Sequence, residues 1–255
     1  MTRIPLSRRP LARLALTLMA APLALGLAAC SKGEGEAAKG EAVASVAPPA
    51  GKTWTDVVAK TPDGGYLMGN PEAPIKLVEF GALSCSHCAE FAHTSSAELR
   101  DKFVASGRVS YELRLFMLNA LDMPASLLVT CGAPETVPGL AEQFWGWQPA
   151  MFENLQKAGE PQMQAISQQQ PPASFVSLAR VSGMDAFITA RGIAADQAAS
   201  CLADTKKATE LAQQTQDAST KYEITGTPTF MINGDKVTGN TWAEIKTQLE
   251  QRGAR

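Results

Sequence analysis

Apolar residues form two short runs, separated by a helical pattern, in the first half of the chain. Residues 75–83 (IKLVEFGAL) are almost continuously apolar, and residues 109–118 (VSYELRLFML) form a second run. Short runs of this kind are typical of strands buried on both faces of a sheet. Between them, residues 86–105 carry apolar side chains at helical spacing, and Gly107 follows their end. The pattern predicts a strand–helix–strand unit with parallel strands and a right-handed crossover.

Residues 119–204 lack a strand pattern and are rich in Ala, Leu, Gln and Met. We expect them to form a bundle of short helices, broken at residues 134–138 and at Pro171-Pro172. The glutamine-rich residues 162–170 are expected to form a solvated connection. The aromatic and methionine side chains in and beside this segment are expected to be packing residues rather than a substrate groove: Phe144, Trp145, Trp147, Phe152, Met117, Met123 and Met151.

The C-terminal part of the chain predicts a long helix, a hairpin and a final helix. Residues 203–222 have the pattern of an amphipathic helix. The apolar run 229–232 is followed by Asn233-Gly234 and a second strand through Val237, and Asn-Gly between short apolar runs is a strong hairpin signal. Residues 241–244 (TWAE) form a capping box that opens the final helix. The order of elements predicts an α/β fold with helices inserted between a β-α-β half and a β-β-α half.

The N-terminal residues 1–29 have the pattern of an export signal. They contain four arginines and no acidic residue, and an apolar run from Leu14 to Ala29 is too short for a comfortable bilayer span. This run ends in Leu-Ala-Ala before Cys30, which resembles a lipoprotein signal in which that cysteine becomes lipidated. The alternative is an ordinary cleavage site with Cys30 left over.

The remaining chain divides into a tether and a folded part. Residues 30–51 contain no aromatic residue, Leu or Ile, so we expect a flexible tether. Residues 52–118 and 205–252 are predicted to form one α/β domain, with residues 119–204 as the inserted helical subdomain. Removal of residues 1–29 would take the formal net charge from −2 to −6. A mildly acidic surface argues against nucleic acid or anionic lipid as the main partner.

The candidate chemistry is carried by Cys85-Ser86-His87-Cys88, which follows the first strand and opens the helix. The first turn of a helix has unpaired N–H groups and a partial positive charge, which stabilise a thiolate at Cys85. Cys88 lies three residues further on the same face and can close a disulfide, and His87, if protonated, adds a positive charge. The pair could instead be half of a metal site or a static staple. The chain has only one other histidine, His93, to complete a metal site.

These residues resemble the DsbA-like branch of the thioredoxin superfamily. The resemblance is carried by residues 79–88 (EFGALSCSHC) and 226–230 (GTPTF), and it extends over about residues 52–252. It implies a thioredoxin fold (β-α-β plus β-β-α) with a helical insertion. It also implies that Pro228 is a cis-proline facing the cysteine pair, and that the backbone of Thr227 binds an extended substrate segment.

The resemblance implies two further assignments. Glu79 corresponds to a buried acid that acts as a proton shuttle for the inner cysteine, and burial is expected to raise its pKa. The alternative is a solvated glutamate at the sheet edge. Some members of the family carry a second, structural disulfide in the region of Cys131 and Cys201, although two free buried thiols remain the alternative.

The resulting hypothesis is a periplasmic thiol–disulfide oxidoreductase, tethered to a membrane through lipidated Cys30. It would introduce disulfides into reduced exported polypeptides, be reoxidised by a DsbB-type membrane partner and need no bound cofactor. However, the best-known oxidases of the family carry Val where this chain has Thr227. The alternative is therefore a reductase or isomerase that acts on misoxidised polypeptides and is kept reduced by a DsbD-type donor. An alternative of another class is a copper-handling or chaperone-like binding protein.

Overall fold

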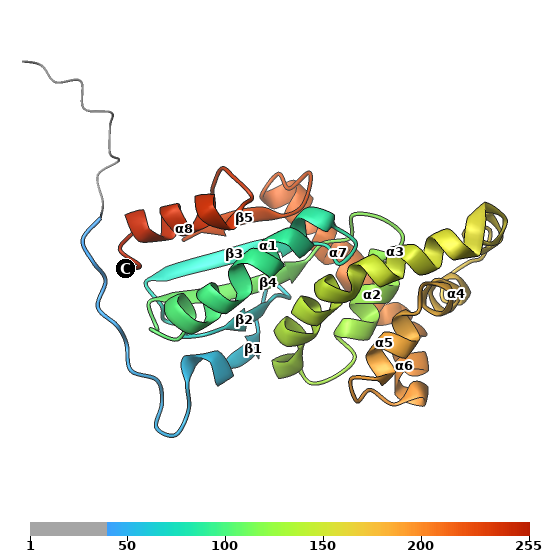
Figure 1. Ribbon diagram of the computed structural model, residues 1–255, viewed down its shortest axis with the longest axis horizontal. Coiled ribbons are helices and arrows are strands. Elements are labelled where there is room, and N and C mark those ends of the chain that lie inside the picture. The colour runs from blue at the N-terminus through green and yellow to red at the C-terminus, as the bar shows by residue number, and fades with distance from the viewer. Residues whose placement is uncertain (1–39) are drawn as a thin grey trace, which may run out of the picture. The chain divides into compact units, whose positions relative to one another are not determined.

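A six-stranded mixed sheet lies at the centre of the computed structural model, which describes residues 40–255 (Figure 1). The strand order is β1-β2-β4-β3-β5-β6. β3 and β4 are parallel, and all other neighbouring strands are antiparallel. The strands are β1 (Val58–Lys60), β2 (Tyr66–Met68), β3 (Ile75–Gly81), β4 (Val109–Leu115), β5 (Thr229–Ile232) and β6 (Asp235–Lys236).

The central strand β3 is buried on both faces, as its apolar run predicts. Ile75 and Leu77 belong to the main core, whereas Phe80 belongs to a second cluster that includes Phe116 and Met231. Because alternate residues of a strand point to opposite faces, these two clusters lie on opposite sides of the sheet. The predicted parallel strand–helix–strand unit is confirmed.

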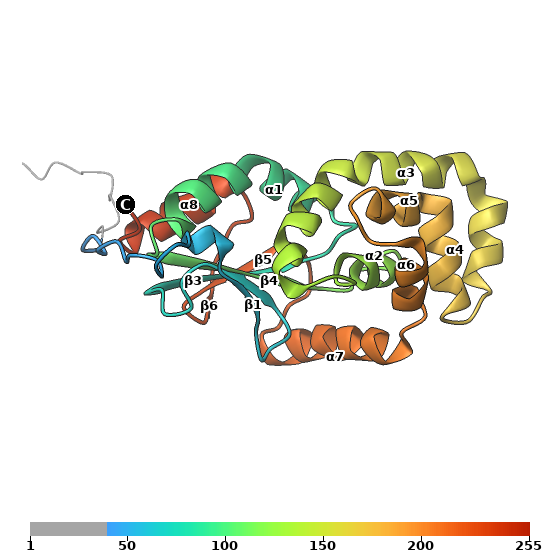
Figure 2. The ribbon, with the colours of Figure 1, turned by 90° about the horizontal axis from the view of Figure 1, so that it is seen from below.

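Helices α1 (Ser86–Glu98) and α8 (Trp242–Gln251) lie on one face of the sheet, and α7 (Thr205–Lys221) lies on the other (Figure 2). A π-helical turn, Leu99–Val104, continues α1 to the point where the sequence predicts its end. The ring of Trp242 packs edge-on against Phe103 at 5.5 Å between centroids. The predicted capping box opens α8.

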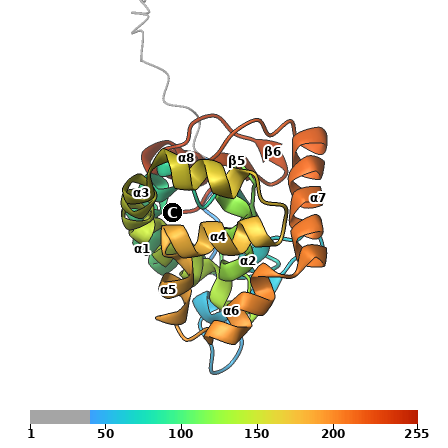
Figure 3. The ribbon, with the colours of Figure 1, turned by 90° about the vertical axis from the view of Figure 1, so that its right-hand side faces the viewer.

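The insertion consists of helices between β4 and α7, gathered beside one end of the sheet (Figures 2 and 3). Its helices are α2 (Asp122–Val129), α3 (Val137–Ser167), α4 (Ala173–Ser182), α5 (Met184–Thr189) and α6 (Ala195–Leu202), with a 3-10 turn at Pro134–Thr136. A disulfide joins Cys131, after α2, to Cys201 in α6, with a Cα–Cα distance of 5.7 Å. The thioredoxin fold with a helical insertion is confirmed.

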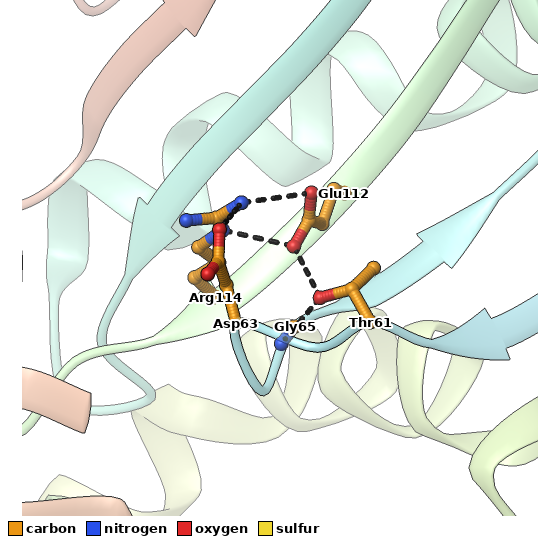
Figure 4. A network of polar contacts seen from close by, with 5 residues as sticks. All are labelled: Thr61, Asp63, Gly65, Glu112 and Arg114. Atoms are coloured by element: carbon orange, nitrogen blue, oxygen red, sulfur yellow. Dashed lines mark hydrogen bonds and ion pairs between the residues drawn. The ribbon is translucent and has the colours of Figure 1, made fainter. Parts of the chain in front are cut away.

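Strands β1 and β2 are absent from the sequence prediction, because three residues are too few to show the periodicity of a strand. A polar network holds the turn between them against β4 (Figure 4). Arg114 pairs with Asp63 at 2.9 Å and with Glu112 at 2.8 Å, and Glu112 accepts a hydrogen bond from Thr61. The Thr61 hydroxyl in turn accepts the N–H of Gly65. Contacts with β4 therefore hold these two short strands in the sheet, although their own residues do not predict them.

Two expectations for the insertion are wrong. Helix α3 continues through much of the expected glutamine connection, and its kink lies earlier, at Gly159, where φ is 76°. Glycine adopts this conformation without steric cost. Phe152 is 41% exposed and does not belong to the core, whereas Phe144 and Met151 are buried as expected. The helix face that carries Phe152 points away from the bundle.

Residues 40–51, the described part of the predicted tether 30–51, differ from that prediction. The N–H of Val43 donates to the carbonyl of Gly253 at 3.0 Å, and that of Val46 donates to Ser106 at 3.0 Å. The lack of large apolar side chains predicts no attachment, but this stretch is attached through its backbone. The described segment therefore runs along the domain instead of standing apart from it.

The predicted signal segment 1–29 and lipidated Cys30 lie outside the described residues. Within residues 40–255, no helix is both long and apolar enough to cross a membrane.

The Cys131–Cys201 disulfide closes a loop with a sequence separation of 70. On the chain-entropy account, a crosslink of this span stabilises the fold by about 4 kcal/mol. We expect the double variant Cys131→Ala/Cys201→Ala to lose an amount of this order in the free energy of unfolding, measured by urea denaturation with Cys85 and Cys88 reduced in both proteins. An unchanged denaturation midpoint would contradict the stabilising role.

Candidate active site

Cys85 is the N-cap residue of α1, and Cys88 lies one turn into the helix. The backbone N–H of Cys88 donates to Sγ of Cys85 at 3.2 Å. Both thiols are free. Cys85 retains 5% exposure, whereas Cys88 has none. Cys85 is therefore the sulfur of the pair that an incoming thiol can reach, and Cys88 is the inner one.

The pKa of Cys85 is lowered to about 6. Hydrogen bonding with the Cys88 thiol is the largest cause, and contacts with Thr227 and with the N–H groups of Cys88 and His87 add to it. Burial opposes these effects without cancelling them. In most molecules Cys85 is therefore a thiolate at pH 7. His87 is exposed on the first turn of α1, as is His93 further along the helix.

The segment before β5 faces the cysteine pair. The Thr227-Pro228 peptide bond is cis. The carbonyl oxygen of Thr227 lies 3.2 Å from Sγ of Cys85, and it accepts a hydrogen bond from that sulfur when Cys85 is a neutral thiol. Antiparallel pairing of β5 with β3 aligns Phe230 with Glu79 and so brings these distant segments together.

Glu79 is fully buried beneath the pair. Desolvation raises its pKa to about 8, although the Tyr111 hydroxyl, which donates to Oε2 at 2.7 Å, lowers it in part. Burial also raises the pKa of the Cys88 thiol, as do its hydrogen bond with Cys85 and the nearby Glu79 carboxyl. The solvated alternative for Glu79 is wrong. A buried acid that can hold or release a proton near neutral pH lies close to the inner cysteine.

Oε1 of Glu79 has no hydrogen-bond partner among the described residues. Glu79 and Tyr111 line a cavity of about 230 Å³ that also contacts Arg100 and Glu142. Apolar side chains such as Phe91 form most of the wall of this cavity, in keeping with the desolvation that raises the pKa of Glu79.

Three insertion residues that the sequence analysis did not identify as site residues contact the loop before Cys85. The side chains of Trp145, Gln148 and Asp122 each hydrogen-bond to residues between Ala82 and Cys85. Trp145 is identified from the sequence only as a packing residue. No local motif marks a lone Gln or Asp within a helical segment.

Within residues 40–255, no group of three or more His, Cys, Asp or Glu side chains is arranged to hold a metal ion. The two histidines are both exposed on α1.

The fold and the site define a DsbA-like protein of the thioredoxin superfamily, with a CxxC pair at a helix start, a facing cis-proline and inserted helices. Residues 61–251 match the protein family described as Thioredoxin, and the chain belongs to that family.

Two of the similar proteins carry names of disulfide chemistry. "Putative protein-disulfide oxidoreductase" of Rickettsia prowazekii is 26% identical over 180 residues, which cover 71% of this chain and 58% of that protein. The chain thus spans less than two thirds of that relative. The crystal structure of a protein-disulfide isomerase from Novosphingobium aromaticivorans is 30% identical, covers 76% of this chain and 99% of that one, and has a TM-score of 0.72.

The structure of Wolbachia pipientis alpha-DsbA1 shares the fold. It has 19% identity, a TM-score of 0.56, and coverage of 74% of this chain and 91% of that chain.

Titration of the reduced protein tests the origin of the Cys85 acidity. Thiolate absorbance near 240 nm should rise with a midpoint near pH 6. In Cys88→Ala the midpoint should move to higher pH, because the largest stabilising hydrogen bond is lost. Equal midpoints in the two proteins would show that Cys88 does not stabilise the thiolate.

Stability of the oxidised protein tests the burial of Glu79, since its disulfide-bonded cysteines do not titrate. The folded carboxyl, with a pKa of about 8 against 4.5 unfolded, binds more protons than the unfolded one. The free energy of unfolding should therefore fall as pH rises from about 5 to about 8.

Glu79→Gln should lose this fall and be more stable than the native protein at pH 8. Its amide can still accept the Tyr111 hydroxyl. Glu90→Gln, a change at an exposed position on α1, is the matched control and should keep the native pH profile. A fall in Glu79→Gln as steep as in the native protein would be evidence against the assigned burial effect.

Proposed function

We propose that this chain is an exported thiol–disulfide oxidoreductase that introduces disulfides into other exported polypeptides. The observation that carries the proposal is the position of Cys85 at the N-cap of α1, where its sulfur accepts the N–H of Cys88 at 3.2 Å and the pKa of the thiol is lowered to about 6. A stabilised thiolate favours the dithiol form over the disulfide, which makes the Cys85–Cys88 disulfide a stronger oxidant. The same effect makes Cys85 a good leaving group.

The proposed reaction transfers two electrons from the substrate to the cysteine pair. A substrate thiolate attacks Sγ of Cys85, the Cys85–Cys88 bond breaks, and Cys88 leaves with the electron pair. Because the pKa of Cys88 is raised, this sulfur takes a proton, and Glu79 is placed to supply it. A second substrate thiolate then attacks the substrate sulfur of the mixed disulfide and releases Cys85 as a thiolate.

Thr227 and Pro228 are proposed to align the substrate. The carbonyl of Thr227 lies beside Sγ of Cys85, so an extended segment that pairs with this backbone would present its cysteine to the reactive sulfur. Lipidation of Cys30 would keep the enzyme at a membrane of the periplasm, near a DsbB-type partner that restores the disulfide. Reduced exported polypeptides are the proposed substrates.

A disulfide isomerase or reductase is the second candidate. Two observations favour it: Thr227 stands before the cis-proline, and the relative from Novosphingobium aromaticivorans bears the name of an isomerase. In this role the pair would stay reduced, through a DsbD-type donor, and attack misoxidised substrates with the Cys85 thiolate.

Equilibration with glutathione distinguishes the two candidates. The oxidase role predicts a reduction potential more positive than about −180 mV and fast oxidation of a reduced model protein. Cys85→Ser should abolish this oxidation, whereas the Cys131→Ala/Cys201→Ala variant should retain it when assayed below its unfolding temperature. A potential near the thioredoxin value of about −270 mV, together with efficient repair of a scrambled substrate, would replace the oxidase by the isomerase or reductase.

A further inference from the structure

The four residues that join β3 to α1 are all held by side chains of the insertion. On one side, Nε1 of Trp145 donates to the carbonyl of Ala82 at 3.0 Å. One turn along α3, Nε2 of Gln148 donates to the carbonyl of Leu83 at 2.8 Å and to that of Cys85 at 3.1 Å. Helix α3 therefore provides the donors for three of these four carbonyl groups.

Asp122, the first residue of α2, bonds the fourth residue of the loop. Its Oδ1 accepts the N–H of Ser84 at 2.8 Å, and its Oδ2 accepts the Ser84 hydroxyl at 2.9 Å. The same oxygen accepts the backbone N–H groups of Leu118 and Asn119 at 3.0 and 2.9 Å. The carboxylate thus ties the loop to the end of the segment that leads from β4 into the insertion.

These bonds are shielded from water. Trp145 and Gln148 are each 4% exposed, and Asp122 is fully buried. Loss of the Gln148 amide would leave the buried carbonyl of Leu83 without a partner among the described residues, which is destabilising, whereas the carbonyl of Cys85 would keep the N–H of Ala89. The loop is therefore held strongly in one conformation.

Gln148 acts directly at the residue that carries the reactive sulfur. The carbonyl of Cys85 accepts both Nε2 of Gln148 and the N–H of Ala89, at 3.1 Å each. The orientation of the Cys85 carbonyl sets the geometry of the first turn of α1. That geometry directs the N–H of Cys88 at Sγ of Cys85. A shift of this peptide would weaken one of the hydrogen bonds that stabilise the thiolate.

We propose that the inserted helices position the redox centre, and that Gln148 is the main positioning residue, supported by Trp145 and Asp122. Gln148 holds the backbone of Cys85 in the conformation that places its sulfur over the helix start. The consequence of this positioning for catalysis rests on the proposed function. The effect of Gln148 on the acidity of the Cys85 thiol does not. An insertion that only covered the site would leave the acidity of Cys85 unchanged when this donor is removed.

Gln148→Met removes both hydrogen bonds and nearly preserves the shape of the side chain. The matched control is Asn154→Leu, in which the lost amide donates to the carbonyl of Ser182 at 3.0 Å, within the insertion and from the same helix. Neither change alters the net charge. Asp122→Asn would be a less clear test, because it can change the charge near Cys85 as well as the hydrogen bonds.

The measurement is the titration of Cys85 in the reduced full-length protein by thiolate absorbance, with thermal unfolding of each variant. Gln148→Met should lower the acidity of Cys85 about three- to tenfold, which is a rise of the pKa by about half to one unit. Asn154→Leu should lose thermal stability and keep the native titration. Trp145→Phe, which removes the donor to Ala82, should give a smaller shift in the same direction and provides a second variant if Gln148→Met does not fold.

A native titration curve in both Gln148→Met and Trp145→Phe would overturn the proposal, as would an equal shift in Asn154→Leu. The titration involves no substrate and no membrane partner. If the chain failed to oxidise any polypeptide while Gln148→Met still shifted the titration, the proposed function would fail and the positioning role would stand.

Discussion

The contact that Cys88 makes with the sulfur of Cys85, through its thiol and its backbone N–H, is the interaction on which the site depends. It exists because Cys85 occupies the N-cap position, where the helix leaves N–H groups unpaired and presents a partial positive charge. This contact favours the charged form of the outer sulfur, whereas burial favours the neutral form of the inner one. The pKa values of two chemically identical thiols are therefore shifted in opposite directions, and the outer sulfur is the reactive one.

The sheet supplies the other constraints. A short loop joins the end of β3 to the cysteine pair, and antiparallel β5 begins directly after Pro228, so the pairing of the two strands sets the cis-proline segment against Cys85. The same strand β3 places Glu79 under the pair, on the face covered by α1 and α3. The carboxyl can exchange a proton near neutral pH because it is desolvated there and still bonded to Tyr111.

The insertion contributes polar groups as well as packing. Its helices bury Phe144 and Trp145, as the sequence pattern predicts, but they also direct three side chains with polar groups at the loop that carries Cys85. The domain with the chemistry and the subdomain beside it are thus joined by hydrogen bonds at the position where the chemistry takes place. In this family fold, sequence changes in the insertion therefore have a physical route to the reactivity of the thiol.

The sequence by itself determined the elements that have strong local patterns: the buried strands β3 and β4, helix α1 with its cysteine pair, the terminal hairpin and the capping box of α8. Periodicity, turn residues and caps act over a few residues, so they can be read without knowledge of the fold. Only the tertiary structure decided the short strands β1 and β2, the attachment of residues 40–46, the burial of Glu79 and the roles of Gln148 and Asp122. Each of these depends on partners far away in the chain, and a lone amide or carboxyl group acquires its function only when folding brings such a partner within hydrogen-bond distance.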